Sequence, residues 1–205
     1  MPQGDSNGGV PADDERREPL PAPEHIAVLA ASCIDFVRHA TGVEPDLQAE
    51  TLPVVDHWVA TARQSLPERP SLLPLLARTL GAYFGEVLRR RIPAFWRAGE
   101  EGDERSWAVC GSEVYFAINP VGVAYDALCA GNDHPGPSSE LRCTAEEEGA
   151  VAVRLAALPE VPEDEFWLLS TRLETLEIAA EALREAKRAR GYEDMTFGEE
   201  DYGAD

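Results

Sequence analysis

The spacing of apolar residues predicts three helices in the first part of the chain. Over residues 23–41, 51–66 and 71–91, apolar side chains recur every three or four positions, as on the buried face of an α-helix. Gly42 directly follows the first range, and glycine is the residue that most often ends a helix. Pro53 falls in the first turn of the second range, where its missing N–H breaks no hydrogen bond. The first half of the folded region is therefore expected to be helical.

A different pattern begins near residue 106 and predicts a β-hairpin. Residues 106–110 and 112–118 alternate or are rich in the residue types that favour strands, and Gly111 lies between them. The preceding acidic segment, 99–105, is expected to be an exposed loop. The two apolar segments are thus predicted to pair as short antiparallel strands.

The third part of the chain returns to helical patterns. Residues 120–130 predict a short helix, and residues 141–143 fit one more short strand. Thr144 and Glu147 have the spacing of a capping box, in which each side chain accepts a hydrogen bond from the backbone of the other residue. This pair predicts that a helix begins here and continues to about residue 158.

The last helix, predicted over 163–190, is the longest and carries a heptad pattern. Its apolar residues follow alternating steps of three and four, which is the spacing of the a and d positions of a coiled coil. They are Phe166, Leu169, Leu173, Leu176, Ala180 and Leu183. The pattern favours a helix that buries one stripe, either in its own domain or against a second copy of the chain.

Together these elements predict a mostly helical α+β fold, with five or six helices around a short antiparallel hairpin or small sheet. Residues 23–190 are expected to form one globular domain. The segments 1–22 and 191–205 are rich in acidic residues, and the first is also rich in proline and glycine. Because such composition buries too little apolar surface to offset the entropy of ordering, both segments are predicted to be disordered.

Two glycines inside the third predicted helix need an explanation, because each costs a helix roughly 1 kcal/mol relative to alanine. We expect Gly81 and Gly85 to let the C-terminal helix, which carries Leu173 and Leu176, approach closely. Glu86 is expected to pair with the arginines that follow it. All five residues are therefore interpreted as structural.

Two segments carry a recognisable pattern: LGAYFGEVLRR (80–90), before a tryptophan and a hairpin, and FWLLSTRLETLEIAAEAL (166–183). Together they resemble small bacterial domains of unknown function, in which a G-x-Y-x-G-E-x-x-R helix precedes a tryptophan-containing hairpin. The resemblance covers residues 24–190 and implies an independent domain. It lends no catalytic residues, because those domains have no assigned activity. Pro93 and the 99–105 loop depart from the pattern by separating helix and strand further.

The net charge of the chain limits the kinds of partner that it is expected to bind. The chain has 38 acidic and 18 basic residues, for a formal net charge of -20. Such a field disfavours binding to nucleic-acid phosphates and favours a basic protein partner, although solubility alone also accounts for an acidic surface. The sequence shows no signal-peptide pattern and no apolar run of membrane-spanning length, and its four cysteines form no C-x-x-C pair. A cytoplasmic bacterial protein with reduced thiols is expected.

The acidic loop predicts where a partner binds. Two tryptophans bracket it, and tryptophan is enriched at the centres of protein interfaces. The candidate partner-binding residues are Trp96, Trp107, Glu100, Glu101, Asp103 and Glu104. Packing of the two indoles in the core is the alternative interpretation.

The sequence carries no recognisable motif for catalysis or metal binding. It has no G-x-x-x-x-G-K-[ST] or G-x-G-x-x-G loop for phosphates and no serine in a nucleophile-elbow context. Cys129, His134 and Cys143, with Asp126 or Asp133, lack the paired spacing of zinc ligands. We therefore expect no catalytic residue, no cofactor and no metal.

These observations predict a non-catalytic acidic binding module that docks a basic protein partner, such as an immunity-type protein or an adaptor of a bacterial system. Two alternatives stay open. One is an enzyme with a cleft between the hairpin and the helices, using Glu86 and Tyr83. The other is a structural homo-oligomer through the C-terminal helix.

Overall fold

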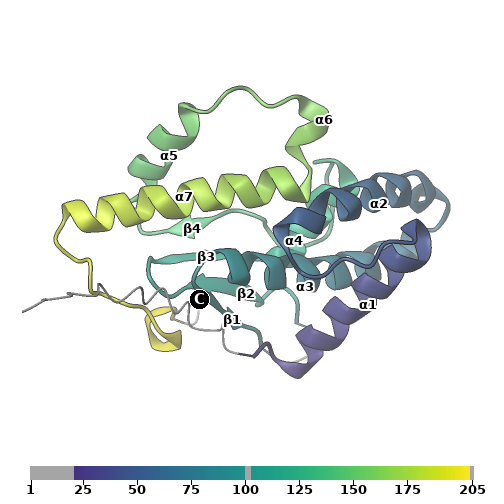
Figure 1. Ribbon diagram of the computed structural model, residues 1–205, viewed down its shortest axis with the longest axis horizontal. Coiled ribbons are helices and arrows are strands. Elements are labelled where there is room, and N and C mark those ends of the chain that lie inside the picture. Colours follow the sequence, from purple (N-terminus) through teal and green to yellow (C-terminus); the bar gives the residue numbers. More distant parts are fainter. Residues whose placement is uncertain (1–20, 100–102, 204–205) are drawn as a thin grey trace, which may run out of the picture.

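A computed structural model describes residues 21–99 and 103–203 and shows a mostly helical α+β fold with a small antiparallel sheet (Figure 1). The fold class predicted from the sequence is therefore confirmed. Nearly all of the segment 1–22, which the sequence predicts to be disordered, lies outside the described residues. Within the part of the chain that is described, no helix has both the length and the apolar character needed to cross a membrane.

The first three helices form where the apolar spacing places them. They are α1 (Glu24–Thr41), α2 (Leu52–Ser65) and α3 (Leu73–Arg91). Gly42 ends α1 in the left-handed conformation, with a φ of 76°, and donates its N–H to the carbonyl oxygen of Arg38 at 2.9 Å. Short 3-10 turns lead into α2 and α3.

The sheet is an antiparallel array of four short strands. In spatial order they are β1 (Ala94–Arg97), β2 (Ala108–Gly111), β3 (Phe116–Ile118) and β4 (Arg142–Cys143). The predicted hairpin is β2 and β3, and the short strand predicted over 141–143 is β4. β1 has no counterpart among the predicted strands, because four residues directly after a helix are too few to show alternation.

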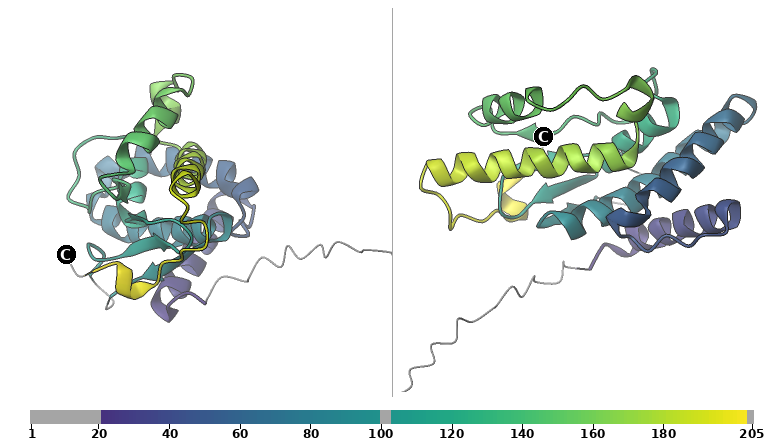
Figure 2. Two further views of the ribbon diagram at one scale, coloured as in Figure 1. Left: turned by 90° about the vertical axis from the view of Figure 1, so that its left-hand side faces the viewer. Right: turned by 45° about the horizontal axis from the view of Figure 1, so that its top comes forward.

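After the hairpin comes α4 (Pro120–Cys129). After β4 come α5 (Glu148–Ala156), α6 (Glu163–Phe166) and α7 (Leu169–Ala189). The predicted capping box does not form, because Thr144 Oγ1 donates to Glu147 Oε2 at 2.8 Å, and α5 begins only at Glu148. The connection between α5 and α6 projects from the body of the molecule as an arch (Figures 1 and 2).

The long helix predicted over 163–190 is interrupted between α6 and α7, and Asp56 of α2 supplies the reason. Its carboxylate accepts hydrogen bonds from the N–H groups of Leu169 (2.7 Å) and Ser170 (3.2 Å), and from the Ser170 hydroxyl (2.7 Å). The first N–H groups of a helix have no partner within the helix itself. A side chain from another part of the chain therefore fixes where α7 begins.

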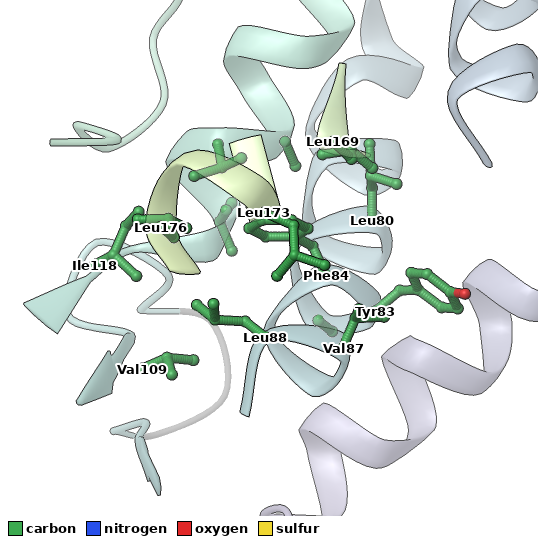
Figure 3. Packing of buried hydrophobic residues seen from close by; sticks show 14 of the residues in the cluster. Leu80, Tyr83, Phe84, Val87, Leu88, Val109, Ile118, Leu169, Leu173 and Leu176 are labelled. Carbon is green, nitrogen blue, oxygen red and sulfur yellow. The ribbon is translucent and has the colours of Figure 1, made fainter. Parts of the chain in front are cut away.

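The heptad stripe of α7 packs into the core of its own chain. Leu169, Leu173 and Leu176 are at most 4% exposed, and Figure 3 shows them with Leu80 and Phe84 of α3. The same holds for the later stripe positions of α7, which are also buried. From Leu169 to Leu183 the stripe is therefore covered by its own chain, whereas Phe166, its first predicted position, lies in α6 and is 49% exposed. The homo-oligomer through the C-terminal helix stays a prediction.

The C-terminal segment packs against the sheet. Tyr202 is only 3% exposed, donates its hydroxyl to the carbonyl oxygen of Gly111 at 2.7 Å and accepts the N–H of Phe116 at 3.2 Å. Its ring stacks on that of Tyr115, with centroids 4.5 Å apart. The sequence predicts disorder for 191–205, yet Tyr202 of this segment is buried, because an aromatic side chain supplies buried surface that an acidic average composition conceals.

Asp56 makes the start of α7 sensitive to pH. Burial raises the pKa of its carboxyl above the ordinary value, and hydrogen bonds from Ser170 and Leu169 oppose that rise. The native state then binds the proton more tightly than the unfolded chain, so the carboxyl's contribution to stability falls as pH rises through the folded-state pKa. We expect the free energy of unfolding of the wild type to exceed that of Asp56→Asn by a margin that grows as the pH is lowered from neutral to about 4.

Urea denaturation of both proteins over this pH range measures the difference. The wild-type advantage should level off below about pH 4, where the carboxyl is protonated in both states. A difference that stays constant, or that shrinks towards acid pH, contradicts the assignment.

Candidate functional site

Trp96, expected at a partner interface, is buried against α3. Its Nε1 donates to Glu86 Oε1 at 2.7 Å, and Arg89 donates from Nε to the same oxygen at 2.5 Å and from Nη2 to Glu86 Oε2 at 2.8 Å. The three side chains are 4–7% exposed. We call this group, with Gly85 beneath the indole, the Trp96 clamp. The pairing of Glu86 with an arginine is confirmed, while the role of Trp96 as an exposed anchor is wrong.

The other residues predicted around the acidic loop do not form a shared surface either. Trp107 is 1% exposed and packs against the His25 ring, so core packing holds for both indoles. Glu104 forms an ion pair with Arg78 at 2.6 Å. Asp103 is exposed, and its carbonyl oxygen accepts hydrogen bonds within its own turn. The remaining two, Glu100 and Glu101, lie outside the described residues.

The two glycines of α3 make room for α4 and Trp96 rather than for α7, which corrects the prediction. A Cβ on Gly81 would lie 2.7 Å from the Cα of Val121. A Cβ on Gly85 would lie 2.3 Å from the indole carbon Cζ2 of Trp96 and 3.1 Å from Pro120. The close approach is therefore real, but its partners are the start of α4 and the clamp.

The enzyme alternative through Glu86 and Tyr83 finds no site. Tyr83 is fully buried, and its hydroxyl lies 3.2 Å from Thr51 Oγ1; burial raises its pKa to about 12. Glu86 is held in the Trp96 clamp. Because the two groups are engaged in separate buried contacts and neither lines the cleft described below, they do not converge on a substrate.

The residues considered for a metal are also separated. His134 Nε2 lies 2.9 Å from Asp126 Oδ1, and its ring stacks on Tyr125 at 5.1 Å. Burial raises the pKa of the Cys129 and Cys143 thiols, which opposes formation of the thiolate that a metal needs. Among residues 21–99 and 103–203, no three His, Cys, Asp or Glu side chains are placed to hold a metal ion.

An exposed surface that the sequence analysis did not select lies between α5 and α7. Every residue from 156 to 166 is exposed, and we call this segment the acidic arch. Its carboxylates belong to Glu160, Glu163, Asp164 and Glu165, and it contains no basic residue. Its large apolar side chains are Leu158, Val161 and Phe166, which are 38–49% exposed. Residues 159–162, which include Pro159 and Pro162, fall between two helices predicted from the sequence, and residues 163–166 are predicted to begin the last one.

The apolar end of the acidic arch is fixed in place. The Phe166 ring lies edge-on to that of Trp167, with centroids 4.8 Å apart. Trp167 in turn covers Gly131, whose φ of 71° is a conformation that glycine adopts without strain. Phe166 therefore projects from an anchored base.

A cleft of about 730 Å³ lies where β4, α7 and the C-terminal segment meet. Three arginines line it: Arg97 of β1, Arg142 of β4 and Arg172 of α7. In sequence they are far apart and follow no motif. The strand register places Arg97 and Arg142 on the sheet, and the packing of α7 brings Arg172 to the same cleft. Tyr202, from a segment predicted to be disordered, forms part of the cleft wall.

No family model matches this chain, and no characterised protein or solved structure matches it either. The resemblance to small bacterial domains therefore stays a prediction.

The Trp96 clamp predicts an unusual effect of alanine at Gly85. Alanine is the better helix former by roughly 1 kcal/mol, yet its Cβ would overlap the indole of Trp96. We expect Gly85→Ala to lower the free energy of unfolding by about 1–3 kcal/mol, the usual cost of overpacking a core. Chemical denaturation measures this value.

Gly149 of α5 provides the matched control. A Cβ there meets no atom within 4 Å, so Gly149→Ala is expected to stabilise the protein by up to about 1 kcal/mol. If Gly85→Ala is as stable as the wild type, the indole does not pack on α3 as described.

Proposed function

We propose that this protein is an acidic docking module that binds a basic protein partner through the acidic arch, as an immunity-type protein or an adaptor does. The observation that carries the proposal is the acidic arch itself, in which four carboxylates and three large apolar side chains lie together on a segment whose residues are all exposed. The docking role predicted from charge is kept, and its location moves from the 99–105 loop to residues 156–166.

Charge supports a basic partner for this surface. Four carboxylates lie within six residues of the acidic arch, and the nearest basic side chain on α5, Arg154, already pairs with Glu185 at 3.4 Å. The whole chain, including these four carboxylates, carries a formal net charge of -20. A concentrated field of one sign raises the association rate of an oppositely charged partner and repels acidic competitors.

The apolar side chains supply affinity that charge alone does not. Leu158, Val161 and Phe166 each keep more than a third of their surface exposed. Covering what remains contributes roughly 0.5–1 kcal/mol for each side chain. The occupant that fits is a basic segment with apolar residues between its cationic side chains, such as an amphipathic helix or an extended strand.

Both ends of the acidic arch are tied to the core, so the surface is presented in a defined place. Before it, Val151 of α5 is buried against the core. After it, Asp56 fixes the start of α7. A binding segment with fixed ends loses less conformational entropy on docking than a free tail does.

Charge reversal of the acidic arch tests the proposal. A variant with Glu160, Glu163, Asp164 and Glu165 replaced by lysine is immobilised beside the wild type, and host lysate is passed over both. We expect a basic protein to be retained by the wild type at low salt, to elute as salt is raised, and to be lost from the variant. Mass spectrometry identifies the retained protein.

A second variant reverses the same number of charges elsewhere. Glu24, Glu68, Glu174 and Glu193 are exposed and lie outside the acidic arch. This control should retain the partner with only modest weakening. Equal loss from both variants would show a diffuse charge effect, and retention by the arch variant would refute docking at this segment.

A further inference from the structure

The segment after α7 crosses one face of the sheet, and we call residues 192–203 the C-terminal strap. Gly191, with a φ of 77°, separates it from the helix, and the strap then returns to β2 and β3 (Figure 1). Tyr202 is its buried residue, Phe197 and Gly198 are half-buried, and the remaining residues of the strap are exposed. The strap is therefore attached to the sheet mainly through its aromatic side chains.

The two faces of the sheet pack against different parts of the chain. Val109 and Ile118, which pair across β2 and β3, belong to the main core. Their neighbours Cys110 and Ala117 also pair, and because strand residues alternate between faces, they point to the opposite side. There they form a separate cluster with Tyr202 of the strap. Separation of the strap from the sheet therefore removes contacts of this cluster and leaves those of the main core in place.

A small set of contacts holds the strap, in addition to the two hydrogen bonds of its tyrosine hydroxyl. Phe197 donates its N–H to the carbonyl oxygen of Ser112 at 2.8 Å, and its ring lies edge-on to that of Tyr115, with centroids 5.6 Å apart. Nζ of Lys187 donates to the carbonyl oxygen of Met195. Segments with few buried apolar contacts and an exposed backbone are those that open locally while the rest of a protein stays folded.

The strap also borders the 730 Å³ cleft. Tyr202 and Gly203 form part of the cleft wall, and Arg97 Nη1 donates to the carbonyl oxygen of Gly203 at 2.9 Å. Cys110 lines the cleft as well, yet it is only 1% exposed. Movement of the strap away from the sheet therefore widens the cleft and uncovers Cys110.

We propose that the C-terminal strap is a gate, which opens as a unit while the main core stays folded and thereby controls access to the cleft. Its closed position is the one described above, with the tyrosine hydroxyl bonded to the sheet. The inference does not rest on the proposed docking function, since the strap and the acidic arch share no residue.

The cysteines of the chain report on this motion. Burial raises the pKa of the Cys110 thiol to about 11, and because the thiolate is the form that reacts, the closed protein protects it. Cys33 of α1 is fully buried in the main core, so its thiol is uncovered only when that core unfolds. Cys129 and Cys143 are partly exposed and react without either event.

Alkylation of the full chain with iodoacetamide at neutral pH measures both events at once. Mass spectrometry of proteolytic peptides gives the rate at each cysteine, and each rate is divided by that of the same cysteine in the urea-unfolded chain. We expect Cys110 to react about tenfold or more faster than Cys33. Its rate should also depend less on low concentrations of urea, because opening of the strap exposes less surface than unfolding does.

Two variants separate opening of the gate from unfolding of the core. Tyr202→Phe keeps the ring and removes the hydroxyl with its two hydrogen bonds, so we expect it to raise the Cys110 rate about tenfold. Val55→Ala, at a fully buried position of α2, destabilises the open and closed forms alike. It is expected to raise the Cys33 rate about tenfold and to leave the Cys110 rate unaltered.

Melting temperatures show whether each variant is folded, and the wild-type rates decide the question if one is not. Equal rates and equal urea dependence at Cys110 and Cys33 in the wild type would mean that the strap is released only when the whole protein unfolds. An unchanged Cys110 rate in Tyr202→Phe would mean that reagent reaches this thiol without movement of the strap. Either result, or an equal rise at both cysteines in Val55→Ala, overturns the proposal.

Discussion

The buried contact between Glu86, Arg89 and Trp96 determines how the helical and β parts of this protein meet. Its charged groups lie in the core, where loss of one partner of an ion pair typically costs about 3–5 kcal/mol. Because Trp96 must reach Glu86 across the bare backbone of Gly85, the chain turns sharply after α3 and enters β1 within three residues. The position of β1 then fixes the strands that pair beside it, and with them the face that carries the cleft.

Local patterns predicted the local structure well and the long-range contacts poorly. Helical spacing gave α1, α2 and α3 within a few residues, and β-forming residues located the hairpin of β2 and β3. The break before α7 was missed because Asp56, which creates it, lies 113 residues from Leu169 in the sequence. No window of neighbouring residues contains that hydrogen bond, so apolar periodicity continued the helix through it.

The candidate functional surfaces likewise depend on long-range contacts that local sequence patterns do not contain. Composition indicated an acidic partner-binding protein, but it could not say which acidic segment is exposed beside apolar side chains. Trp96 and Trp107 looked suited to an interface by residue type, and only their burial shows that the core uses them. The arginines of the cleft carried no signal at all, since Arg97 and Arg142, on the two edge strands, share one face only through the successive pairing of β1 with β2, β2 with β3 and β3 with β4.

The exposure of the acidic arch has an evolutionary consequence. Substitutions at exposed positions usually change stability by less than about 0.5 kcal/mol, so residues 156–166 can vary with little penalty to the fold. The core, by contrast, tolerates little change around the Trp96 clamp. Under the proposed docking function, selection can therefore change the preferred partner one residue at a time, while the framework that displays the segment stays constant.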